Sequence, residues 1–274
     1  MSISTAVRSI DMGKRSSPRS FLFQVFLLTR RNLMTIARTP EALLPPIGIS
    51  VFFLIVYQST LGRAAGFIPG IDGDYLSFIL PLSIVSASLS GAGIAAQNVV
   101  RDIESGYFDK LLLTPVSRAV LLLSPILAGA LILGLQATIV VGVGLLLGLE
   151  PATGWAGLLA VIGFSVLLGT GFAGFTVSAA LGTGNAAATQ GASFIFFPMI
   201  FLAPTFVPIE LLEGWLATAA KLNPITYVLA ATRSLIASGW DASALGQGLL
   251  ACLILATLTY ALAVLALRSR TRRA

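Results

Sequence analysis

Long apolar runs alternate with short polar connections along almost the whole chain. A helix needs about 20 residues to cross a hydrocarbon core of about 30 Å, and the runs have about that length or more. We place six of them, at about 43–61, 76–100, 119–149, 156–181, 188–207 and 242–267. The pattern predicts an all-α membrane protein with six transmembrane helices, in which residues 17–274 form one domain.

The composition agrees with this pattern and excludes several classes of enzyme. Hydrophobic residues make up 56% of the chain and charged residues 10%, and the mean hydropathy is +0.93. Histidine is absent and Cys252 is the single cysteine. These counts exclude Ser-His and Cys-His nucleophile pairs, an internal disulfide, and zinc sites built on cysteine or on a His-Glu-x-x-His motif. We therefore expect neither a catalytic site nor a metal site.

The basic residues predict how the chain is oriented. Most of them precede the first run, follow the last run or lie in the second connection: Arg8, Lys14, Arg15, Arg19, Arg30, Arg31, Arg38, Arg101, Lys110, Arg118, Arg268, Arg270, Arg272 and Arg273. Only Arg63, Lys221 and Arg233 fall on the other side. By the positive-inside rule, both termini and the second connection are cytoplasmic. The basic excess orients the protein and can contact anionic membrane lipids, so we expect no nucleic-acid partner.

The second connection, residues 101–118, is a charged island between apolar runs. Six of its eighteen residues are charged: Arg101, Asp102, Glu104, Asp109, Lys110 and Arg118. An isolated charge inside hydrocarbon costs at least a few kcal/mol, so this segment must face water. Its mixture of charged, aromatic and aliphatic residues indicates a segment that binds another protein.

Two further segments depart from the simple pattern of spans. After a polar tail at 1–16, which we expect to be flexible and cytoplasmic, Ser17-Pro18 begins an amphipathic helix that ends near Arg38. We expect this helix, with Arg31 and Arg38 near its polar face, to lie in the cytoplasmic interface. Residues 208–241 are too interrupted to span, and a crossing there would put the arginine-rich C-terminus outside. A hairpin that enters the membrane from the outer side and returns fits the charge rule better.

The chain carries no recognisable energy source of its own. No Gly-x-x-x-x-Gly-Lys-Ser/Thr phosphate loop occurs, so we expect no nucleotide site in this chain. Acidic residues are nearly absent from the spans, which argues against a carboxylate relay for ion coupling and against a secondary transporter. If the protein moves a cargo, the energy comes from a partner.

Two motifs resemble those of a known family. The charged island, Arg101-x-x-Glu104-Ser-Gly-Tyr-Phe-Asp-Lys-Leu-Leu-Leu-Thr-Pro115-Val-Ser-Arg118, resembles the signature that follows the second span in type 2 ABC exporter permeases. This family includes daunorubicin-resistance and lipid-export permeases. The stretch Leu222-Asn-Pro-Ile-Thr-Tyr227 with Arg233 is similar to the family's outer hairpin. One departure is Tyr107-Phe108, where many members have threonine followed by an aliphatic residue.

The resemblance implies a mechanism and a set of partners. Family members work as dimers, of identical or related permease chains, bound to separate ATPase subunits that hold ATP and Mg. The charged island would be a cytoplasmic coupling helix seated on the ATPase, with the N-terminal helix beside it. In that interpretation Tyr107, Phe108 and Leu111 occupy a pocket of the ATPase. The coupling residues would be Arg101, Glu104, Ser105, Gly106, Tyr107, Phe108, Asp109, Lys110, Leu111, Pro115 and Arg118, and the outer hairpin residues Asn223, Pro224, Tyr227 and Arg233.

The expected cargo path lies between two permeases, along the second and fifth spans. Candidate lining residues are Ser86, Ser90, Gln97, Asn98, Ser193, Phe194 and Phe197. Their mild, uncharged polarity suits a hydrophobic or amphipathic compound such as a drug, antibiotic or lipid. Export of a polysaccharide or lipid-linked glycan, or a scaffold or sensor without transport, are the alternatives. The expected location is a bacterial cell membrane, with several passes.

Overall fold

The computed structural model describes residues 20–61, 75–205 and 209–273, and within them all side chains except those of residues 40–42, 61, 90, 210 and 273. The expected flexible tail, residues 1–16, lies outside the described residues. The described part of the chain is helical and contains no strand. Its elements are α1 (Phe21–Ala37), α2 (Pro40–Leu61), α3 (Tyr75–Glu104), α4 (Tyr107–Leu112), α5 (Arg118–Leu146), α6 (Gly154–Thr183), α7 (Ala186–Ser193), α8 (Phe196–Leu202), the short turn η2 (Ile209–Leu211), α9 (Gly214–Leu222), α10 (Pro224–Arg233), the π-helical turn η3 (Ser234–Ser238) and α11 (Ala242–Arg273).

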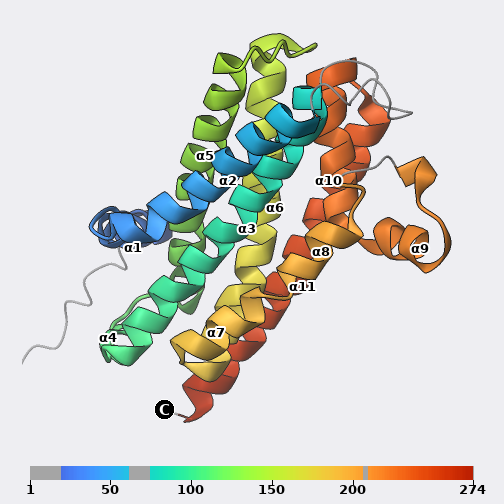
Figure 1. Ribbon diagram of the computed structural model, residues 1–274. Coiled ribbons are helices and arrows are strands. Elements are labelled where there is room, and N and C mark those ends of the chain that lie inside the picture. The colour runs from blue at the N-terminus through green and yellow to red at the C-terminus, as the bar shows by residue number, and fades with distance from the viewer. Residues whose placement is uncertain (1–19, 62–74, 206–208, 274) are drawn as a thin grey trace, which may run out of the picture.

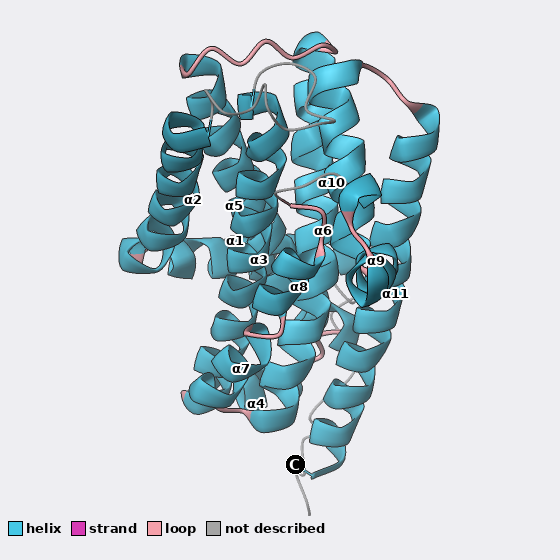
Figure 2. Cartoon of the chain, turned by 45° about the vertical axis from the view of Figure 1, so that its right-hand side comes forward, coloured by secondary structure: helices cyan, strands magenta, loops and turns pink. Residues whose placement is uncertain are grey.

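The long helices α3, α5, α6 and α11 run side by side as a bundle (Figures 1 and 2). In both views α4, α7 and the C-terminus lie at the same end of the bundle, and α1 lies crosswise to the long helices in Figure 2. The connection from α5 to α6 lies at the opposite end, where Ala152 donates its N–H to the carbonyl of Ile236 in η3 (2.8 Å). The fold therefore brings the second connection, residues 101–118, close to the end of the chain.

In the described ranges, five helices are long and apolar enough to cross a membrane: Leu43–Thr60, Tyr75–Glu104, Arg118–Leu146, Gly154–Thr183 and Ala242–Arg272. They correspond to five of the six predicted runs. The remaining run, 188–207, is not one continuous helix, because α7 ends at Ser193 and α8 begins at Phe196. Pro198 has no N–H to donate to the carbonyl of Phe194, one turn earlier, which favours a break here, whereas α3 and α5 continue through Pro81 and Pro125. The sequence-based expectation of six continuous spans is corrected to this extent.

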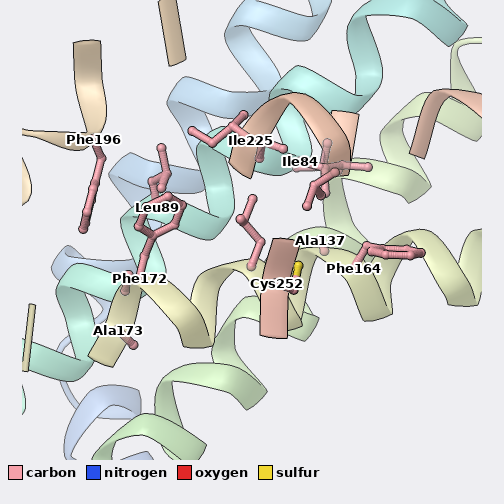
Figure 3. Close-up of a cluster of buried hydrophobic side chains, with 14 of the residues drawn as sticks. Ile84, Leu89, Ala137, Phe164, Phe172, Ala173, Phe196, Ile225 and Cys252 are labelled. Atoms are coloured by element: carbon pink, nitrogen blue, oxygen red, sulfur yellow. The ribbon is translucent and has the colours of Figure 1, made fainter. Parts of the chain in front are cut away.

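Small residues and interhelical hydrogen bonds hold the bundle together. A Cβ added to Gly144 would overlap the side chain of Leu80, so α5 approaches α3 closely at this glycine. Ser88 of α3 and Ser165 of α6 share a hydrogen bond of 2.7 Å, and Thr259 of α11 donates to the carbonyl of Gly171 (2.7 Å). Close backbone approach and such polar contacts are what drive helix association where lipid removes the hydrophobic force. Figure 3 shows the apolar core that they frame, where Phe172 of α6 and Phe196 of α8 lie with their ring centroids 4.4 Å apart.

The segment after α8 folds back on itself before α11 begins. At its return point, Asn223 donates to the carbonyl of Met199 in α8 (2.6 Å) and caps α10 by accepting the N–H of Ile225 (3.0 Å). Pro224 occupies the first helical turn, where its missing N–H has no cost. At the far end of α10, Arg233 donates to the carbonyls of Pro204 and Thr205 (2.7 and 2.8 Å) and lies over the ring of Phe78 (3.8 Å). Both ends of α10 therefore contact α8 or the residues that directly follow it.

Candidate functional site

The second connection forms a tight turn between α3 and α5. Gly106 has a positive φ of 68°, a conformation that glycine adopts without steric cost, and it turns the chain from α3 into the short helix α4. Beyond α4, the side chain of Gln24 accepts the N–H of Ser117 (3.2 Å) and so joins α1 to the start of α5. The predicted partnership between the N-terminal helix and the charged island is therefore present as direct contact.

Arg31 of α1 makes the principal contact with the connection. Its guanidinium donates two hydrogen bonds of 2.5 Å to the two carboxylate oxygens of Asp102, and it lies 4.1 Å from the centroid of the Tyr107 ring. The hydrogen bond to Asp102 raises the pKa of Arg31, although partial burial acts in the opposite direction. A bidentate pair combined with a cation–π contact fixes both the distance and the orientation of the two segments.

A second arginine, Arg270 of α11, approaches α4 as well. Its guanidinium lies 5.8 Å from the centroid of the Phe108 ring and donates to the carbonyl of Leu181 (3.2 Å). Gly184, which has a φ of 61°, leaves room for it, since a Cβ there would lie 3.0 Å from Nη1 of Arg270. We call Arg31 and Arg270, with Asp102, Tyr107 and Phe108, the arginine clamp. The sequence showed Arg270 only as one of several C-terminal basic residues, and no local signal marked this role.

Phe108 is an internal residue. Its side chain is 3% exposed and belongs to the main core cluster. The expectation that Phe108 enters a pocket of a partner is therefore wrong for this structure. The physical reason is that α4 is a short helix with one apolar face, and the bundle beside it buries that face.

The other predicted coupling residues are distributed over the surface of the connection. Leu113, which the sequence analysis did not single out, is 89% exposed. Tyr107, Leu111 and Gly106 are half-buried, and Arg38 is exposed at the C-cap of α1. The exposed residues are Arg101, Glu104, Ser105, Asp109, Lys110, Pro115 and Arg118. The surface of the connection thus carries charges of both signs around the exposed side chain of Leu113.

A groove of about 580 Å³ lies between α2, α3 and the α7–α8 pair. It collects most of the residues predicted to line a cargo path: Ser86, Gln97, Asn98, Ser193, Phe194 and Phe197. The side chain of Ser90 lies outside the described residues. Arg101, predicted as a coupling residue, lines the groove as well.

The two ends of this groove differ in polarity. Towards α4, Gln97 donates to the side chain of Gln190 (3.4 Å), and Asn98 and Arg101 lie beside them on α3. Asn98 is 7% exposed, and its Nδ2 has no hydrogen-bond partner among the described residues. Farther along, the wall is made of aromatic and aliphatic side chains such as Phe53, Phe197 and Ile200. The groove is therefore amphipathic along its length.

Comparison with known proteins decides the family. Residues 23–237 match the model of the ABC-2 type transporter family. The chain belongs to this family. The resemblance drawn from the charged island is thereby confirmed. The α3–α4 turn, the groove and the long helices described above are accordingly parts of an ABC-2 permease.

Several relatives are transport permeases. The chain is 28% identical over 227 residues to the probable doxorubicin resistance ABC transporter permease protein DrrC of Mycobacterium tuberculosis, covering 83% of this chain and 82% of the relative. It is 27% identical over 238 residues to the daunorubicin resistance ABC transporter permease protein DrrB1 of Streptomyces coeruleorubidus, covering 85% and 82%. It is 25% identical over 236 residues to the putative transport permease ycf38 of Cyanophora paradoxa, covering 84% and 81%.

Proposed function

We propose that this ABC-2 permease is the membrane subunit of an ATP-driven exporter of a hydrophobic or amphipathic compound. It works as a dimer of permeases with separate ATPase subunits, which bind the ATP and Mg. Family membership and the names of the drug-resistance relatives support this function. The chain spans a bacterial cell membrane, with both termini and the second connection in the cytoplasm.

The observation that carries the proposal is the form of the second connection. The arginine clamp holds α4 against both α1 and α11, while Asp109, Lys110 and Leu113 remain exposed. Such a surface suits an interface in which a central apolar side chain is buried and the charges around it set register. A push by an ATPase on α4 passes to α3 directly and to α1 and α11 through the clamp.

The described helices also suit a six-crossing topology. In this proposal α7 and α8 together make the fifth crossing, α9 and α10 form an outer re-entrant hairpin, and α11 returns to the cytoplasm. The exposed apolar side chains of α1, among them Leu22 (74%) and Phe26 (61%), fit an interfacial helix in contact with lipid. In this proposal, the cargo moves through the groove, along α3 and α8.

The experiment that tests the function is co-purification of the tagged permease with its ATPase in mild detergent, followed by cargo export from cells. The Leu113→Ser variant is expected to lose the ATPase, because it removes the bare apolar side chain from the centre of the contact. Leu146 provides a control for Leu113, because both are leucines that are 89% exposed. Leu113 precedes the start of α5, whereas Leu146 lies at its end. Leu146→Ser is expected to keep the ATPase. Wild-type protein that brings down no ATPase contradicts the exporter and favours a scaffold or sensor.

A further inference from the structure

We propose that the groove binds an amphipath whose head carries a phosphate or carboxylate, and that Arg101 recognises this head. The inference rests on the proposed export function and narrows its cargo from amphipaths in general to anionic ones. It departs from the drug-resistance names of the relatives, because it disfavours compounds with a cationic head.

The first argument is the charge of the groove. Arg101 lies in the last turn of α3 and lines the groove, whereas no acidic side chain of the described residues does. The neighbouring carboxylate of Asp102 is already bound to Arg31 through both oxygens. In the part of the chain that the structure describes, Arg101 forms no ion pair. Its charge therefore remains available to a ligand.

The second argument is the set of hydrogen-bond donors around this charge. Gln97 precedes Arg101 by four residues, so the two side chains share one face of α3. Asn98 is nearly buried, yet its Nδ2 lacks a partner among the described residues. That atom is covered from solvent, so Arg101 and Gln97 supply the donors that a ligand in the groove can reach. A phosphate or carboxylate accepts hydrogen bonds from a guanidinium fork and from an amide at once.

The third argument is the apolar wall next to these donors. Ser86 and Gln97 both line the groove and lie eleven positions apart on α3, or about 16 Å along the helix axis. Phe53 of α2, Phe194 at the C-cap of α7 and Phe197 of α8 line the same groove. The groove therefore offers an apolar surface for a tail and an anion-binding end for a head. An ammonium head placed at that end would meet the guanidinium without a carboxylate to offset the repulsion.

The test uses two fluorescent probes with the same apolar body, 11-(dansylamino)undecanoic acid and its amine-terminated analogue, and the purified permease in a neutral detergent. The wild-type protein is expected to bind the acid at least tenfold more tightly than the amine. Arg101→Gln should weaken binding of the acid about tenfold, the size of one charge-assisted contact. Arg101→Glu should reverse the preference. Arg272→Gln, which removes an exposed cation near the C-terminal end of α11 and outside the groove, should change neither affinity.

Equal affinities of the wild-type protein for the two probes would overturn the inference, as would an Arg101→Gln variant that is monodisperse and binds the acid like the wild type. Because binding requires no ATPase, the two proposals fail separately. A permease that recruits an ATPase but ignores the probe charge refutes only the anionic cargo. A permease that recruits no ATPase but binds the acid through Arg101 refutes only the exporter.

Discussion

The α4 segment and the α8 segment are both short helices that follow a break in a helix, but different interactions hold them. At α4 the chain turns at Gly106, and the arginine clamp ties the short helix to α1 and α11. At α8 the helix restarts before Pro198, and aromatic packing holds Phe196 while Phe197 and Phe201 stay exposed (62% and 54%). Directional charged contacts position a segment, whereas an exposed aromatic face can adapt to what it meets. Under the proposed function, the first segment is suited to transmit a movement and the second to contact a cargo.

The largest expected effect concerns the internal position of Phe108. Phe108→Ala should lower the free energy of unfolding by about 3–4 kcal/mol, because it removes a large side chain from a packed site. Leu113→Ala should change stability by less than about 0.5 kcal/mol, since its side chain is exposed. Thermal unfolding in detergent measures both. Similar losses for the two variants would contradict the division of α4 into an internal and an external side.

The next effect is expected from the ion pair. Arg31→Gln and Asp102→Asn should each lower the free energy of unfolding by about 1–3 kcal/mol. This value lies between those of exposed and buried ion pairs, because Arg31 is 34% and Asp102 15% exposed. The double variant should be little worse than either single variant, because the shared contact is lost only once. In the complex, we expect ATP hydrolysis to continue while export falls. Arg30→Gln is the control, since Arg30 is exposed and forms no ion pair with the described residues.

A smaller effect is expected at the other arginine of the clamp. Arg270→Gln should lower the free energy of unfolding by about 1 kcal/mol, because it removes the hydrogen bond to Leu181 and the contact with Phe108. It should also reduce the amount of cargo exported per ATP hydrolysed. The exposed Arg268, two residues earlier on α11, provides the control Arg268→Gln. If both variants export alike, α11 takes no part in holding α4.

The smallest effect on stability is expected at the wall of the groove. Phe197→Ala should change the free energy of unfolding by less than about 0.5 kcal/mol, because the ring is mostly exposed. The same variant should weaken binding of an amphipathic probe several-fold, which fluorescence titration can measure. Stability lost without a change in binding would assign Phe197 to packing and remove it from the cargo path.

The repeated apolar runs determined most of the fold class in advance. Five of the predicted runs are helices long enough to span a membrane, and the charged island lies in the expected turn between two of them. Hydrophobic periodicity and length suffice for this, because a backbone in lipid must satisfy its own hydrogen bonds. The interruption between α7 and α8 was missed because the run stays apolar through Pro198, and hydropathy does not register the missing N–H.

For the candidate site, too, the sequence predicted some features and missed others. The residues of the second connection could be found from local sequence, since six charges in eighteen positions cannot lie in hydrocarbon. Their roles could not. That Phe108 points inward, that Arg101 faces the groove and that Arg270 reaches α4 all depend on which helices become neighbours.

By itself, the sequence determined that this protein is a helical membrane protein of the ABC-2 family, with a charged connection exposed to water and no phosphate loop. Only the tertiary structure decided which arginines pair with which partners. Arg31 and Asp102 are 71 residues apart and Arg270 and Leu181 are 89 apart, and contacts of that separation leave no mark in local composition. The physical reason is that transfer from water to lipid acts on each residue separately. Ion pairs, cation–π contacts and grooves instead exist only between surfaces that folding brings together.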